Sequence, residues 1–88
     1  MSYTTAFPDF PTASLPSLPT AWEDTSWHND ACPSWHVGGG WYVYIDYPTA
    51  EQREFPTNSR FTVYHIDDDK QLYHGDDWEE VLKAVASI

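Results

Sequence analysis

The chain has 88 residues, enough for one small domain whose core needs reinforcement to be stable. Its five Trp, six Tyr and four Phe supply that reinforcement, since each aromatic side chain buries about 150–250 Å² when packed. The 14 Asp and Glu outnumber the four Lys and Arg, and the resulting net charge of -10 argues against direct binding to nucleic-acid phosphates. A surface of this sign favours a basic protein as the partner.

The chain shows no sign of a membrane or secretory protein. Its first residues lack the basic segment and apolar run of a signal peptide, and no stretch approaches the roughly 20 apolar residues of a membrane span. Cys32 is the single cysteine, so no disulfide can form within the chain, which fits a reducing compartment. We therefore expect a cytoplasmic protein with no membrane contact.

Residues 1–20 are rich in proline, which removes backbone donors and disfavours both helix and sheet. We expect an extended, irregular arm over residues 1–20, followed by a single domain over residues 21–88. The arm also carries the apolar residues Tyr3, Phe7, Phe10, Leu15 and Leu18. So many apolar groups favour an arm that lies against its own domain, with the surface of a partner as the alternative.

Residues 22–40 have no clean hydrophobic period and are interpreted as loop. The exceptions are one short turn of helix at residues 21–26 and a brief strand at residues 35–37. Three consecutive glycines at 38–40 favour a turn with positive φ.

Residues 41–47 (WYVYIDY) and 60–66 (RFTVYHI) are runs of aromatic and β-branched residues, in which every second side chain lies on the same face of a strand. The two runs therefore predict two strands. A polar loop over residues 67–70 then leads into a third strand at residues 71–74. With the brief strand at residues 35–37, we expect a small antiparallel meander of three to four strands.

The hydrophobic period changes to that of a helix after Gly75, where the apolar side chains are Trp78, Val81, Leu82 and Val85. Asp76 or Asp77 can accept the first free amide hydrogens as N-cap, and Glu79 or Glu80 completes a capping box. The sequence therefore predicts an α+β domain in which one C-terminal helix packs on one face of a small antiparallel sheet.

Two metal sites can be considered. His28, Cys32 and His36 are spaced four residues apart, with His65 and His74 in the predicted sheet, and zinc accepts such ligands. Pro33 breaks the helix that this spacing would need, so zinc is an alternative only. For calcium, Asp67, Asp68 and Asp69 are consecutive rather than alternating, and Asp76 and Asp77 do not restore the order of ligands in a calcium loop. We expect no bound metal or other cofactor.

The sequence also lacks the pattern of an enzyme. No Gly-rich loop precedes a Lys and a Ser or Thr, and the glycines at 38–40 lead into a strand rather than a helix start. Cys32 near a histidine, with Asp30 to orient it, could form a nucleophilic pair, but a domain of this size has little room for a shielded pocket. We therefore expect a protein that binds rather than catalyses.

Negative charge is concentrated between residues 67 and 80, a stretch that contains seven carboxylates and one basic residue, Lys70. They belong to Asp67, Asp68, Asp69, Asp76, Asp77, Glu79 and Glu80. One predicted strand of about four residues, roughly 13 Å, joins the two acidic clusters, so the carboxylates are expected to form a stripe. With exposed tyrosines beside it, among them Tyr42, Tyr44, Tyr64 and Tyr73, such a stripe imitates phosphates beside bases. We predict that these acids and Tyr73 contact the partner, and the alternative is a solvated face with ordinary capping acids.

The chain resembles the small acidic proteins with which phages and mobile elements inhibit nucleic-acid-processing defence complexes, especially anti-CRISPR proteins. The resemblance rests on its size, on the clusters DDD at 67–69 and DDWEE at 76–80, and on the absence of catalytic signatures. It implies an inhibitor that blocks a basic nucleic-acid-binding surface in the cytoplasm of a bacterial host. The alternatives are an immunity protein or antitoxin that masks a basic toxin, and a small zinc-binding domain.

Overall fold

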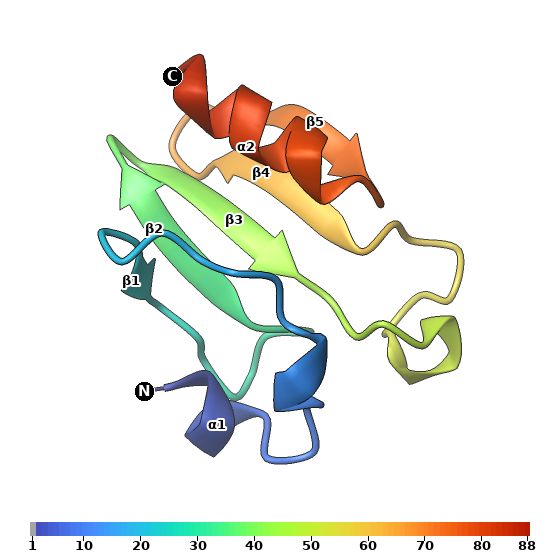
Figure 1. Ribbon diagram of the computed structural model, residues 1–88. Helices are drawn as coiled ribbons and strands as arrows, with labels where there is room; N and C mark the ends of the chain where they lie inside the picture. The colour runs from blue at the N-terminus through green and yellow to red at the C-terminus, as the bar shows by residue number, and fades with distance from the viewer. Residues whose placement is uncertain (1) are drawn as a thin grey trace.

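The structure, a computed structural model, describes residues 2–88 and contains a five-stranded antiparallel sheet and one C-terminal helix (Figure 1). The strands are β1 (Glu23–Asp24), β2 (Ser34–Gly38), β3 (Trp41–Ile45), β4 (Phe61–His65) and β5 (Lys70–Gly75). Each strand pairs with the next one along the chain, so the sheet is a simple meander. The predicted α+β class is confirmed, with five strands where three to four were expected.

Strands β3 and β4 form where the sequence alternates most clearly. Val43 and Ile45 on β3 are fully buried and lie opposite Val63 and Phe61 on β4. β3 ends at Ile45, two residues earlier than the pattern indicated, and β4 ends at His65, one residue earlier. A loop connects the two strands. This loop contains the short 3₁₀ helix η2 (Ala50–Gln52).

The prediction of a helical turn at residues 21–26 is wrong, because β1 lies there. Glu23 pairs with His36 and Asp24 with Trp35, so β2 satisfies backbone groups that a helical turn would have satisfied internally. The Asp24 carboxylate also accepts hydrogen bonds from the N–H groups of Tyr3 and Ser26. Asp24 thus joins the start of the chain to the edge of the sheet.

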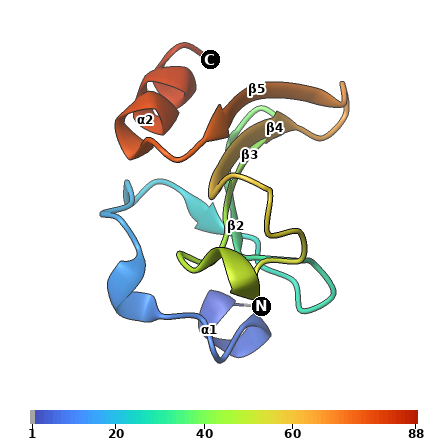
Figure 2. The ribbon, with the colours of Figure 1, turned by 90° about the vertical axis from the view of Figure 1, so that its right-hand side faces the viewer.

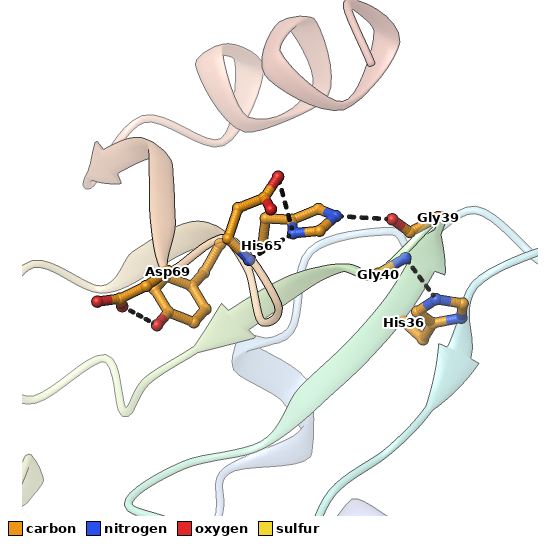
Figure 3. A network of polar contacts seen from close by, with 7 residues as sticks. His36, Gly39, Gly40, His65 and Asp69 are labelled. Carbon is orange, nitrogen blue, oxygen red and sulfur yellow. Dashed lines mark hydrogen bonds and ion pairs between the residues drawn. The ribbon is translucent and has the colours of Figure 1, made fainter.

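The turn between β2 and β3 uses the three glycines as predicted, with positive φ at all of them. Two histidines bind this turn (Figure 3). His36 Nε2 accepts the Gly40 N–H at 3.4 Å, and His65 Nε2 donates to the Gly39 carbonyl at 2.9 Å. A Cβ on Gly40 would lie 2.9 Å from His65 Nε2, so only glycine fits there.

Helix α2 (Trp78–Ala86) packs on β4 and β5 through one apolar side. Trp78 lies between Phe61 of the sheet, 5.1 Å between ring centroids, and Trp22, 5.8 Å away. Val81 is fully buried, and Ala84 packs against the core where the sequence had indicated Leu82. No helix within residues 2–88 has both the length and the apolar character needed to cross a membrane.

The N-terminal segment covers the rest of the same face of the sheet (Figure 2). It contains a one-turn helix α1 (Tyr3–Ala6) and a 3₁₀ helix η1 (Thr12–Ser14), so it is less irregular than its prolines indicated. Phe7 and Phe10 are buried in the core that holds Trp35 and Tyr47. Tyr3 adds a ring contact to Trp35 at 5.7 Å. The apolar residues of this segment therefore lie against their own sheet.

Candidate partner-binding surface

Two of the four basic side chains are engaged within the fold. Arg53 donates to the carbonyls of Tyr47, Pro48 and Asn58 and so holds the loop after β3. Arg60 donates to the Asp46 carbonyl and to Ser14, which fastens η1 to the sheet. Neither guanidinium forms an ion pair among the contacts described for residues 2–88. The exposed carboxylates therefore keep most of their charge uncompensated.

The first acidic cluster, Asp67–Asp69, forms the turn between β4 and β5 and is fully on the surface. Asp69 has a positive φ of 50°, which Asp tolerates in tight turns, and its carboxylate accepts a hydrogen bond from the Tyr64 hydroxyl (Figure 3). This bond raises the pKa of Tyr64. The Asp68 carboxylate lies 3.6 Å from Nδ1 of His65, while the Asp67 side chain makes no hydrogen bond within residues 2–88.

The second acidic cluster, Asp76, Asp77, Glu79 and Glu80, lies at the start of α2, and part of it supports the fold. Asp77 is the N-cap, as predicted, and its carboxylate accepts the Glu79 N–H at 3.0 Å. The Asp76 carboxylate accepts a hydrogen bond from the backbone N–H of Arg60 at 2.7 Å. Glu80 is paired only with exposed Lys83, at 3.7 Å. Asp76 and Asp77 thus have a structural duty that Glu79 and Glu80 lack.

The two clusters are farther apart than the sequence indicated. β5 has six residues rather than four, and a strand of that length spans about 20 Å. The clusters lie at opposite ends of this edge strand, a separation beyond the roughly 8 Å over which charges interact at physiological salt. We call the two clusters together the acidic edge. A partner that engages all of it must extend along the whole of β5.

The tyrosines divide between the two faces of the sheet. Tyr73 lies opposite Val63 on the covered face, and its hydroxyl accepts the Asp77 N–H at 3.1 Å. It therefore supports the start of α2, while its role in partner contact stays a prediction. Tyr42, Tyr44 and Tyr64 lie on the opposite face, half-buried. Tyr73 packs against the core, whereas these three tyrosines do not belong to the core cluster.

The candidate metal ligands are not brought together. His28 lies against exposed Trp27, His36 stacks on Tyr42 at 5.0 Å, and Cys32 is buried. No group of three or more His, Cys, Asp or Glu side chains within residues 2–88 has an arrangement that could hold a metal ion. The zinc alternative therefore finds no support in the geometry.

Cys32 has the wrong environment for a nucleophile. Burial raises the pKa of its thiol, and the nearby carboxylates of Asp46 and Asp30 raise it further. A thiol in such a site stays protonated and unreactive at neutral pH. An open depression of about 340 Å³ does lie nearby, between residues 29–31 and 52–54. Its lining includes Arg53, which is already engaged by backbone carbonyls.

Comparisons with protein-family models, with curated protein sequences and with solved structures found no match to this chain.

Proposed function

We propose that this protein is a non-enzymatic inhibitor of the anti-CRISPR type. It would block a basic nucleic-acid-binding surface of a bacterial defence complex, in the cytoplasm of the host. The acidic edge carries the proposal. Its seven carboxylates are exposed, while Arg53 and Arg60 are turned inward to hold loops. Because the two arginines are used within the fold, the acidic edge has strong negative charge and little positive charge beside it.

A groove that evolved to bind phosphates presents Lys and Arg at the surface, and exposed carboxylates meet the same side chains. Complementary charge accelerates the encounter and places the two surfaces in register. The inhibitor and the nucleic acid would then compete for one site. Salt should weaken the complex, because screening acts on charge pairs at the rim of an interface.

The sharpest test reverses charge at positions that have no structural duty. Asp67→Lys/Glu80→Lys changes one residue in each cluster, and the contact described for these two side chains within residues 2–88 is the exposed ion pair of Glu80 with Lys83. The matched control, Glu51→Lys/Glu54→Lys, gives the same net charge at exposed positions in the loop after β3. Both variants and the wild type serve as bait in nuclease-treated bacterial lysate at low and high salt, and captured proteins are identified by mass spectrometry.

We expect the wild type and the Glu51/Glu54 variant to capture a nucleic-acid-binding protein, to release it at high salt and to be displaced by its DNA or RNA. The Asp67/Glu80 variant should bind at least tenfold more weakly, about 1.4 kcal/mol. The proposal is wrong when the partner is retained by the Asp67/Glu80 variant, or when partner, nucleic acid and inhibitor bind together. Capture of a toxin nuclease would instead identify an immunity protein or antitoxin.

A further inference from the structure

The face of the sheet opposite α2 carries two rows of side chains that run across the strands. In the first row Glu23 lies opposite His36, His36 opposite Tyr42, and Tyr42 opposite Tyr64. In the second row the neighbours are Ser34, Tyr44, Thr62 and His74. Contacts within the rows include the 5.0 Å stacking of His36 on Tyr42 and a 2.9 Å hydrogen bond between Thr62 and His74. We call this surface the tyrosine face.

Neither α2 nor the N-terminal segment covers the tyrosine face. Both lie on the other side of the sheet, as Figure 2 shows. The side chains of Tyr42, Tyr44 and Tyr64 are half-buried, and two of them have a defined partner: Tyr42 stacks on His36, and the Tyr64 hydroxyl donates to Asp69. Three aromatic rings held in place on a rigid sheet lose little conformational entropy when a ligand packs on them.

Carboxylates border this face, and neither row contains Lys or Arg. Asp69 accepts the Tyr64 hydroxyl at the end near the β4–β5 turn. Burial raises the pKa of Tyr44, and the nearby carboxylate of Asp30 raises it further. Glu23 is exposed on the edge strand β1. These carboxylates would attract a positively charged ligand.

We propose that the tyrosine face is the docking surface for an arginine-rich segment of the partner. This inference rests on the proposed function and adds a surface and a side-chain chemistry to it. The planar guanidinium stacks on aromatic rings and forms paired hydrogen bonds with carboxylates, so it can use a ring and a rim carboxylate such as Asp69 together. The compact, strongly hydrated ammonium of lysine uses the carboxylates alone to best effect.

Single-stranded nucleic acid is the other ligand that stacks on tyrosines in a sheet. Its phosphates would approach Asp69, Asp30 and Glu23 with no Lys or Arg in the rows to offset the repulsion. The border of the face thus selects a cation over a nucleotide, although the rings alone accept either. Both ligands are therefore included in the test.

The experiment compares three probes on the full chain: a nona-arginine peptide, a nona-lysine peptide and a uridine decanucleotide. Affinity is measured by calorimetry, and contacts are mapped by NMR of the tyrosine rings. We expect the arginine peptide to bind about tenfold more tightly than the lysine peptide, and the nucleotide not to bind. Ring signals of Tyr42, Tyr44 and Tyr64 should shift, while those of buried Tyr47 should not.

The variant Tyr42→Leu/Tyr64→Leu removes two rings and should abolish the preference for arginine over lysine. Phe55→Leu, at an exposed aromatic away from the sheet, should keep it. Ring shifts in the wild type give the same answer independently of how well the double variant folds. Equal affinities for both peptides, with unshifted tyrosine rings, overturn the tyrosine face but leave the acidic edge and the proposed function intact. Failure to bind either peptide overturns both proposals, and binding of the nucleotide overturns the choice of arginine.

Discussion

Asp46 is the carboxylate that the fold takes out of water, with 8% of its surface exposed. It follows β3, and its Oδ1 accepts the Tyr47 N–H at 2.8 Å. Burial raises the pKa of Asp46, against the opposing effects of that hydrogen bond and of the Arg53 guanidinium. The folded protein therefore binds this proton more tightly than the unfolded chain does.

This shift predicts a pH dependence of stability. Since the folded pKa lies above the ordinary value of 3.8, the contribution of Asp46 is most favourable below pH 3.8 and is lost as the pH rises through the folded pKa. Asp46→Asn keeps an oxygen acceptor for Tyr47 and removes the titration. Relative to the wild type, the variant should gain stability between pH 3 and pH 7, measured by urea unfolding.

Asp67→Asn is the matched control, because it removes the same charge from an exposed position. Its stability relative to the wild type should vary less with pH than that of Asp46→Asn. An Asp46→Asn variant whose relative stability is constant over this range would contradict the raised pKa.

Helix α2 depends on a side chain that also belongs to the acidic edge. The Asp77 carboxylate satisfies the Glu79 N–H, and removal of such a cap costs about 1 kcal/mol. Asp77→Ala should therefore lower the free energy of unfolding by that amount, whereas Asp77→Asn, which retains an acceptor, should lower it less. Chemical denaturation of both variants decides this. Equal losses would mean that the negative charge near the helix start, rather than the cap, stabilises α2.

The elements that the sequence predicted well are those with a strong local period. β3 and β4 alternate over five residues each, and α2 has a cap and an apolar side. β1 has two residues and no period, because it exists only through its pairing with β2. β5 is longer than its apolar residues indicated, since its ends, Lys70 and Gly75, pair with His65 and Phe61 through the backbone.

The candidate surface was also predictable only where it depends on local sequence rather than on strand pairing. Sequence spacing located the seven carboxylates, but the distance between the clusters depends on the length of β5. The tyrosine face depends on register, which sets Glu23 beside His36 and Tyr42 beside Tyr64. From its spacing to Cys32, His36 was predicted only as a candidate zinc ligand. Alternation along residues 34–38 was the one signal that could have placed it beside the tyrosines.

At the scale of the whole molecule, a net charge of -10 is confined to a body of 31 × 27 × 24 Å. Among the contacts described for residues 2–88, the ion pair between Glu80 and Lys83 is exposed and contributes little. At 10 mM salt the screening length is about 30 Å, so carboxylates repel one another across the whole domain. At 150 mM it is about 8 Å, and only neighbours within one cluster interact. Salt should therefore stabilise this fold.

We expect the Tm to rise by a few degrees between 10 and 150 mM NaCl, measured by circular dichroism, because screening relieves repulsion and disrupts few ion pairs. The complex with a basic partner should weaken over the same range, so that folding and binding respond to salt in opposite directions. Glu51→Lys/Glu54→Lys carries less net charge and should show a smaller rise in Tm. A Tm that falls with salt would mean that attractive pairs, rather than repulsion among carboxylates, dominate the electrostatics of the folded state.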